Sequence, residues 1–273
     1  FVSPYSMVLG GYCRQTGWTQ TTLGVACHDQ DGDPVSARWT VAHISGASLS
    51  GRWGFAWIPS GTESTPASSS YSFNSTGNVI VSTRNGTGNY TVRLAGLGRR
   101  TANDREAVIV NAYGDNATCQ PESWSSFSGD DPFGPDLYVE VRCFKPNSSA
   151  VDSRFTVLVV DGERPGARLA FVHADEPLTA TYTPANGAVR PTGHVTVART
   201  GIGEYTVSFT GFFRSGDLRE TFLVSATAST PGRCQIDQWS YGSSQAQPAE
   251  VKVQCAHTNG VAADLPFSLV GLQ

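Results

Sequence analysis

Apolar and polar residues alternate in short runs along the whole chain, and this period of two predicts β-strands. Between 101 and 162 the runs fall at Ala107–Ala112, Cys119–Ser125, Leu137–Cys143 and Arg154–Val160. Between 163 and 215 they fall at Leu169–Ala174, Ala180–Tyr182, Val195–Arg199 and Tyr205–Phe209. Turn-forming pairs such as Asn85-Gly86 and Asn259-Gly260 separate the third run from the fourth. No segment keeps a helical period beyond a turn or two, so the pattern predicts an all-β protein.

Three stretches share one spacing of cysteines and aromatic residues, and we call them B units. Each has a cysteine five residues before a tryptophan, in the pairs Cys13 and Trp18, Cys119 and Trp124, and Cys234 and Trp239. Each has a second cysteine twelve residues before an aromatic residue, in the pairs Cys27 and Trp39, Cys143 and Phe155, and Cys255 and Phe267. Two spacings kept in three copies indicate an internal repeat.

A second kind of stretch, which we call the A unit, lies between the B units. One copy contains YSFNSTG at 71–77 and a strand that begins at Tyr90, and the other contains YTPANG at 182–187 and a strand that begins at Tyr205. Both kinds of unit end in an aromatic residue followed by Thr or Ser and then Val or Leu. The chain therefore divides into five units in the order B-A-B-A-B, at 1–46, 47–100, 101–162, 163–215 and 216–273.

Five copies of a four-stranded unit predict a single all-β domain, a five-bladed β-propeller with the first strand of each blade innermost. One blade cannot bury both of its faces, whereas a ring buries each blade against two neighbours and protects the strand edges. The alternative is a row of tandem two-sheet β-sandwiches, each made of one A unit and one B unit, with a period near 115 residues. That alternative leaves residues 1–45 as a half without a partner.

The six cysteines predict three disulfides, each within one B unit. The expected pairs join the second and third strands of the unit: Cys13 with Cys27, Cys119 with Cys143, and Cys234 with Cys255. No Cys-x-x-Cys or paired histidine spacing suggests a zinc site. Each disulfide would stabilise its unit by about 2–4 kcal/mol, while the A units must rely on packing.

Composition narrows the classes of protein. Hydrophobic residues make up 39% of the 273 residues, enough for a packed core, and a net charge of −4 gives no nucleic-acid footprint. No apolar run is long enough for a membrane span. The chain starts at Phe1 and has Met7 as its one methionine, which favours a processed product that has lost a secretion signal. Five Asn-x-Ser/Thr sequons are expected to be chance occurrences in a chain rich in these residues.

Catalytic and metal motifs are scarce. The nucleophile elbow, the P-loop and the zinc-protease motif are missing. Asp29, Asp31 and Asp33 alternate around a glycine as in a calcium loop, but the matching segments of the other B units favour a polar hairpin turn. No other cofactor is indicated. Adjacent strand residues point to opposite faces, so Asp130-Asp131 and Asp175-Glu176 are not themselves catalytic pairs, although one member of each could join a distant carboxylate.

Aligning the first strands of the five units gives a column of candidate ligand-binding residues. The column consists of Gly10, Trp57, Asn111, His173 and Ser225. In a propeller it would lie around one mouth of the channel, where polar groups and an aromatic ring could meet a ligand. The alternative is that these residues simply fill a narrow channel. Trp53, His173 and the neighbouring Asp175 are also candidates. The two A units differ at these places, and residues that differ between repeats with one scaffold point to function.

The three repeated tryptophans also suggest stacking on a sugar. Because Trp18, Trp124 and Trp239 recur at equal positions, packing between units is the interpretation that the sequence favours.

The strings YSFNSTG, YTVRLAGLG, HADEP and VDSRFTVLVV resemble secreted repeat proteins of actinobacteria and other high-GC bacteria. The similarity runs across the whole chain. It implies an extracellular setting and carries over no catalytic residue.

The expected function is that of a secreted, non-catalytic binding module that recognises a glycan or another cell-surface ligand, as a lectin does. The first alternative is a structural or assembly subunit of an extracellular complex that binds a protein partner. The second alternative is a glycan-active hydrolase, which would need two or three carboxylates converging on one cleft.

Overall fold

The alternating runs fold into short β-strands, and the computed structural model contains no helix among the residues that it describes. These are residues 1–273 without 20, 45–50, 102–104, 128–133, 162–168, 190–191, 213–219, 243 and 245–246. No helix in this part of the chain is long and apolar enough to cross a membrane.

Each B unit contributes four strands and each A unit contributes five. The first B unit has β1 (Val2–Tyr5), β2 (Tyr12–Trp18), β3 (Leu23–His28) and β4 (Arg38–Val41). The first A unit has β5 (Trp53–Ile58), β6 (Thr65–Pro66), β7 (Ser72–Asn74), β8 (Ile80–Gly86) and β9 (Asn89–Leu94). The second B unit has β10 (Glu106–Tyr113), β11 (Thr118–Phe127), β12 (Asp136–Phe144) and β13 (Arg154–Asp161).

The remaining strands repeat this order. The second A unit has β14 (Leu169–Ala174), β15 (Thr181–Tyr182), β16 (Gly187–Val189), β17 (His194–Gly201) and β18 (Glu204–Thr210). The third B unit has β19 (Thr221–Ala226), β20 (Gly232–Ser240), β21 (Ala249–His257) and β22 (Phe267–Leu272). The strands predicted between 101 and 215 are confirmed, with small shifts at their ends.

The strands form four sheets, and each B unit divides its strands between two of them. β10 and β13 belong to a six-stranded sheet of order β3-β2-β10-β13-β5-β7, whereas β11 and β12 belong to a five-stranded sheet of order β11-β12-β9-β8-β6. β19 and β22 belong to a four-stranded sheet of order β16-β14-β22-β19, whereas β20 and β21 belong to a seven-stranded sheet of order β15-β17-β18-β21-β20-β1-β4.

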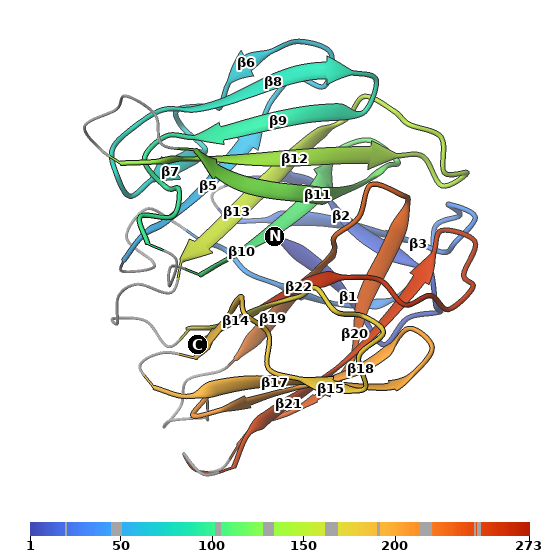
Figure 1. Ribbon diagram of the computed structural model, residues 1–273. Helices are drawn as coiled ribbons and strands as arrows, with labels where there is room; N and C mark the ends of the chain where they lie inside the picture. The colour runs from blue at the N-terminus through green and yellow to red at the C-terminus, as the bar shows by residue number, and fades with distance from the viewer. Residues whose placement is uncertain are drawn as a thin grey trace.

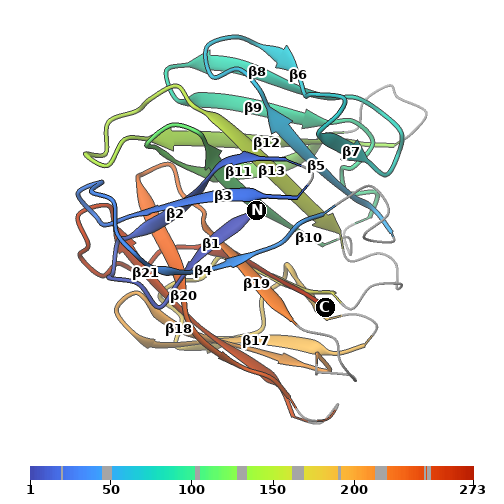
Figure 2. The ribbon, with the colours of Figure 1, turned by 180° about the vertical axis from the view of Figure 1, so that it is seen from behind.

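A propeller blade keeps its strands in one sheet, so the predicted five-bladed ring is not found in the described part of the chain. The topology follows the alternative of tandem sandwiches. The first A unit and the second B unit form one sandwich, drawn at the top of Figure 1, and the second A unit and the third B unit form the other, at the bottom. The first B unit has no A unit of its own. Its β1 pairs with β20 of the lower sandwich, and its β2 pairs with β10 of the upper one (Figure 2).

Both sandwiches are packed in the same way. Phe155 of β13 is fully buried in the upper core with its ring centroid 5.1 Å from that of Tyr90 of β9. Phe267 of β22 and Tyr205 of β18 repeat this contact in the lower core, also at 5.1 Å. The tyrosine hydroxyls bond at the rim, to Asp152 in the upper core and to Asp264 in the lower.

Those two aspartates tie each A unit to its B unit. Asp152 forms two hydrogen bonds with the Arg84 guanidinium, at 3.0 and 2.8 Å, and Asp264 does the same with Arg199, at 2.9 and 2.9 Å. The hydrogen bonds from arginine lower the pKa of both carboxyls. Each aspartate therefore stays ionised and keeps its bidentate ion pair over the physiological pH range.

A third apolar core lies between the two sandwiches. Ile109 and Leu158 of the six-stranded sheet meet Phe171, Leu223 and Val270 of the four-stranded sheet there, and all five are fully buried. The strand β13 is consequently buried on both faces, with Val157 in the upper core and Leu158 in this one. This explains why its sequence VLVV at 157–160 is continuously apolar instead of alternating.

The three B units surround a pseudo-threefold axis. A backbone N–H after the first strand of each unit donates to a carbonyl of another unit, in the pairs Gly114 to Gln15 (2.9 Å), Ser6 to Ile236 (2.7 Å) and Ala228 to Pro121 (3.1 Å). The acceptor is always two residues after the first cysteine of its unit. The three contacts close a ring because each B unit donates once and accepts once.

Polar side chains on the first strands reinforce this ring. Each bonds both the N–H and the carbonyl of one residue in a neighbouring unit: Ser3 with Val224, Asn111 with Val2, and Ser225 with Val110. Ser3 therefore corresponds to Asn111 and Ser225, and the predicted place of Gly10 in that column is wrong. Cys13 lies ten positions after Ser3, whereas Cys119 lies eight positions after Asn111, so the connection to the cysteine differs in length between the units.

The predicted disulfides are confirmed. They join Cys13 with Cys27, Cys119 with Cys143 and Cys234 with Cys255, always between the second and third strands of a B unit. The described residues contain no free cysteine.

Candidate functional site

The repeated tryptophans lie where one B unit meets the next, and we call these three places junctions. At the first junction Trp18 of β2 contacts Tyr113 at the end of β10, with ring centroids 4.8 Å apart. At the third junction Trp239 of β20 contacts Tyr5 of β1, also at 4.8 Å. At the second junction Trp124 of β11 and Thr227, which follows β19, line one pocket.

The first junction is closed by aromatic rings. Trp18 makes edge-to-face contacts with Trp57 of β5 at 5.6 Å and with Tyr71 at 5.2 Å, in addition to Tyr113. Trp57 also contacts Tyr71 and Tyr113, at 5.7 and 5.4 Å. Edge-to-face contact is a favourable arrangement for aromatic rings, so these four side chains pack against one another at this junction.

The second junction carries smaller polar residues at the equivalent positions. Trp57 is hydrogen-bonded to the carbonyl of Tyr71 through its backbone N–H, and His173 of β14 is bonded in the same way to the carbonyl of Asn186. His173 therefore replaces Trp57, and Asn186 replaces Tyr71. Tyr113 directly precedes Gly114 and Thr227 directly precedes Ala228, the two residues whose backbone N–H groups donate to a neighbouring B unit. Thr227 therefore occupies the place of Tyr113.

These replacements account for a pocket of about 630 Å³ at the second junction. Besides Trp124, His173, Asn186 and Thr227, its wall includes Arg99, Arg100, Glu106, Glu122, Ser123, Ser125 and Ser126. The volume lies in the range of small-molecule binding sites.

A buried carboxylate fixes the tryptophan ring in this wall. Glu106 is 4% exposed, and its carboxylate accepts hydrogen bonds from Nε1 of Trp124 at 2.9 Å and from Nε of Arg99 at 2.8 and 2.9 Å. Nη2 of Arg99 donates to Oδ1 of Asn186 at 2.7 Å, and its backbone N–H donates to Ser126. One arginine thus links the two sandwiches and orients both Asn186 and, through Glu106, Trp124.

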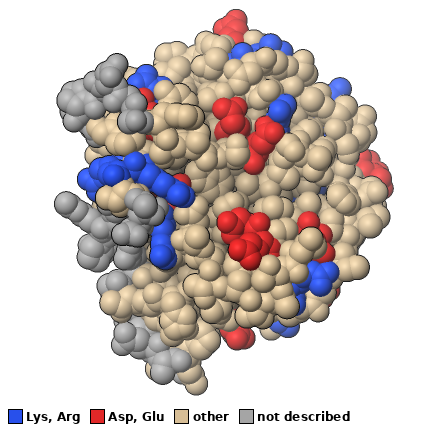
Figure 3. All heavy atoms as spheres, in the orientation of Figure 1, with Lys and Arg blue, Asp and Glu red and all other residues tan. Residues whose placement is uncertain are grey.

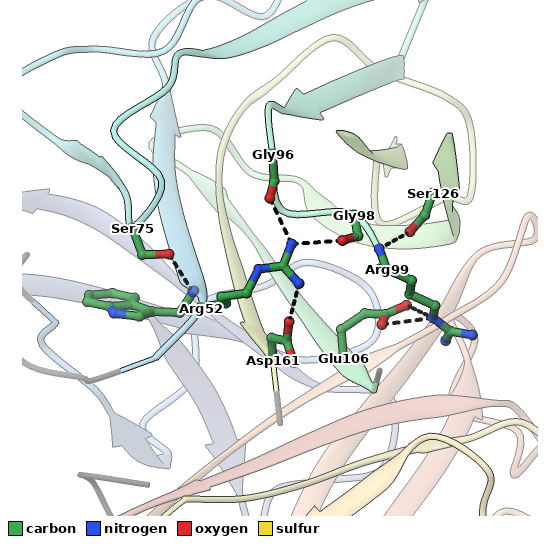
Figure 4. A network of polar contacts seen from close by, with 9 residues as sticks. Arg52, Ser75, Gly96, Gly98, Arg99, Glu106, Ser126 and Asp161 are labelled. Atoms are coloured by element: carbon green, nitrogen blue, oxygen red, sulfur yellow. Dashed lines mark hydrogen bonds and ion pairs between the residues drawn. The ribbon is translucent and has the colours of Figure 1, made fainter. Parts of the chain in front are cut away.

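Arg52 holds the loop that precedes Arg99 in place (Figure 4). The Arg52 guanidinium donates to the carbonyls of Gly96 and Gly98, both at 2.7 Å, and forms an ion pair with Asp161 at 3.0 Å. Both members of the ion pair are nearly buried. Arg99 comes directly after this fixed loop. Its backbone is therefore held in place before any ligand binds, and the site is preorganised.

His173 lines the pocket beside Trp124 and is in contact with it. Its ring centroid lies 4.5 Å from that of Trp124. Burial lowers the pKa of His173, an effect that the Asp175 carboxylate opposes. The imidazole is therefore neutral at neutral pH, and its Nδ1 has no hydrogen-bond partner among the described residues.

Charge is distributed unevenly around this site. Figure 3 shows basic side chains gathered at one edge of the molecule, on the left, while acidic side chains are spread over the rest of that face. The pocket itself combines both signs, with Arg99 and Arg100 beside Glu106 and Glu122.

The structure does not bring the other predicted ligand-binding residues into this pocket. Asn111 and Ser225 are engaged in the ring of B units and line a cavity of about 50 Å³, room for about one or two water molecules. Trp53 is 2% exposed in the core between the sandwiches. Trp57 belongs to the closed first junction, and Asp175 is exposed beside His173.

The aspartates of the proposed calcium loop form a turn. Oδ1 of Asp29 accepts hydrogen bonds from the backbone N–H groups of Asp31 and Asp33, at 3.0 and 2.9 Å. No group of three or more His, Cys, Asp or Glu side chains in the described residues is arranged to hold a metal ion. The acidic pair Asp130-Asp131 lies outside the described residues.

Sequence reasoning missed Arg99, Glu106, Glu122 and Asn186. No signal for Asn186 was present in the sequence, because the strings YSFNSTG and YTPANG match Tyr71 with Tyr182, whereas the backbone hydrogen bonds match Tyr71 with Asn186. The matching Arg105-Glu106 and Arg219-Glu220 pairs were visible, but nothing in the sequence placed Glu106 beside Trp124.

The chain matches no protein-family model, no curated protein and no solved structure. The site must therefore be interpreted from its own geometry.

Proposed function

We propose that this protein is a secreted, non-catalytic binding module that recognises a glycan through the pocket at the second junction. The proposal rests on a difference between the first and the second junction, which are equivalent places in the repeated fold. Four aromatic residues fill the first junction, whereas the second keeps Trp124 and opens a pocket beside it. A divergence confined to one copy is expected where that copy has acquired a ligand.

The chemistry of the pocket suits a polyhydroxyl ligand. An indole offers a flat apolar surface to the C–H groups of a sugar ring. Around it, Glu122 supplies acceptors, Asn186 supplies an amide, and Ser126 supplies a hydroxyl that already accepts from the Arg99 N–H. This combination of one aromatic and several convergent polar groups matches the general pattern of a small-ligand site.

The carboxylates of the pocket favour binding over hydrolysis. Glu106 is ion-paired with Arg99 at 2.8 Å, and Glu122 is ion-paired with Arg142 at 2.7 Å. Carboxylates held by arginine serve well as hydrogen-bond acceptors. In a glycosidase both carboxylates must reach the scissile bond, whereas the Glu106 carboxylate is already occupied by Arg99 and Trp124.

The disulfides support an extracellular setting. Three of them staple the B units, and disulfides form and persist in oxidising compartments.

The proposal is tested by glycan-array binding of the native protein and of the Trp124→Ala variant. Removal of the stacking surface is expected to weaken binding of the best array ligand at least about tenfold, which corresponds to about 1.4 kcal/mol. Trp39→Ala is the matched control, because Trp39 lies outside the pocket wall. Unchanged binding by Trp124→Ala, or a native protein that binds no glycan, would contradict the proposal.

A further inference from the structure

The first B unit leaves two strand edges without a neighbouring strand in the described residues, and the Val41 carbonyl on one of them accepts a hydrogen bond from the Thr221 hydroxyl at 3.2 Å. β3 ends the six-stranded sheet and β4 ends the seven-stranded sheet. In the upper sandwich the equivalent strands are covered by an A unit, since β12 pairs with β9 and β13 pairs with β5. In the lower sandwich β21 pairs with β18 and β22 with β14 in the same way.

An apolar face accompanies these open edges. Leu23 and Val25 of β3 and Trp39 and Val41 of β4 are all partly exposed, with 36% for Leu23 and 43% for Trp39. Their counterparts in the two sandwiches are no more than 1% exposed: Val139, Val141, Phe155 and Val157 in the upper one, and Val251, Val253, Phe267 and Leu269 in the lower one. The first B unit therefore presents the inner face of a sandwich to solvent.

We propose that β3 and β4 form a docking surface for an A unit that is not among these 273 residues. An A unit is the occupant because it covers the same two edges and the same apolar face in both other copies. It would add one strand to β3, with aromatic and aliphatic residues at alternate positions as in β9, and one to β4, as β5 does. The two A units of this chain are already paired with the second and third B units.

Docking would also complete the third junction. In each complete sandwich, a residue of the A unit contacts the tryptophan of the B unit next to that sandwich in the ring. Trp57 contacts Trp18 of the first B unit in this way, and His173 contacts Trp124 of the second B unit. The first B unit adjoins Trp239 through the pairing of β1 with β20. The docked A unit therefore places one residue of its first strand against Trp239.

One substitution sets the specificity of this surface. Ser36 stands three residues before Trp39, at the position where Asp152 precedes Phe155 and Asp264 precedes Phe267. Those aspartates pair with Arg84 and Arg199 of their own A units. An A unit with such an arginine would leave its guanidinium without a carboxylate beside Ser36. An A unit with an uncharged residue at that position would therefore fit this surface better than one with an arginine, although both cover the same apolar face.

The test fuses a second copy of residues 51–108 directly before Phe1. This junction keeps the register, because Val2 corresponds to Val110 and Phe1 therefore to Ile109, the residue after 108. Amide hydrogen exchange in β3 and β4 is expected to slow at least tenfold, and the emission of Trp39 is expected to shift to shorter wavelength. Ser36→Asp in the fusion supplies the missing carboxylate for the added Arg84 and should slow exchange further.

Two controls make the result decisive. Serine at the positions of Tyr90, Val92 and Leu94 in the added copy should abolish the protection. Should the fusion not fold, the unfused protein with a synthetic peptide of residues 78–96 gives a second readout, with protection expected in β3. Unprotected edges in both experiments overturn the proposal. Protection of β3 and β4 in a dimer of the unfused protein, seen by sedimentation, also overturns it, because the surface would then bind a second copy.

Discussion

Phe155→Ala is expected to lower the free energy of unfolding by about 3–5 kcal/mol, the cost of a large cavity in a rigid core. Phe155 is fully buried between the sheets of the upper sandwich, and its ring packs against Tyr90. Both strands are held by ladders on each side, so the surroundings cannot collapse into the space. Denaturant unfolding followed by circular dichroism measures the change.

The matched control is Trp39→Ala at the equivalent position of the first B unit. Trp39 is 43% exposed because no A unit covers it. A larger side chain is removed, yet the expected loss is only about 1 kcal/mol, since little buried contact disappears. Equal losses for the two variants would show that the first B unit is packed as tightly as the complete sandwiches, and would contradict the account of its open face.

Closing the pocket is expected to abolish ligand binding, with a loss of affinity greater than about 100-fold, or about 2.7 kcal/mol. The variant combines His173→Trp, Asn186→Tyr and Thr227→Tyr, and so copies the first junction onto the second. The same backbone already holds Trp57, Tyr71 and Tyr113 around a tryptophan in the other copy. The introduced rings should therefore fill the pocket, and the fold should be kept.

Isothermal titration with the best array ligand measures this loss, and thermal unfolding reports whether the fold survives. The reverse variant, with Trp57→His, Tyr71→Asn and Tyr113→Thr, is the control, because it changes the first junction and should leave binding at the second intact. Retained affinity in the closed variant, with a native unfolding transition, would place the ligand site elsewhere.

Local features of the fold were predictable from the sequence. Alternation located strands such as β14, whose bounds agree with the prediction, and spacing gave the three disulfides. Alternation shows which residues of a strand share a face, but it does not show which sheet the strand joins. The sequence alone therefore favours the propeller. The evidence against it was the apolar run VLVV at 157–160. Such a run indicates a strand buried on both faces, and the core between the sandwiches explains it.

The candidate site was only partly predictable for a similar reason. His173 was identified because it differs from Trp57 on a shared scaffold. Its partner Trp124 was assigned to packing because it recurs, and the recurrence hid the fact that its neighbours differ from copy to copy. The pocket depends on contacts between residues far apart in sequence, such as the bond from Arg99 to Asn186, which no spacing in one sequence reveals.

The most direct test of the pocket follows the indole N–H signals of the six tryptophans by NMR during titration with N-acetylglucosamine, galactose, mannose and glucuronic acid. The account predicts that at least one sugar shifts the signal of Trp124, which is bonded to Glu106 in the pocket wall, and leaves that of Trp18 in place. Shifts confined to other tryptophans, or no shift of Trp124 with any of these sugars, would contradict it.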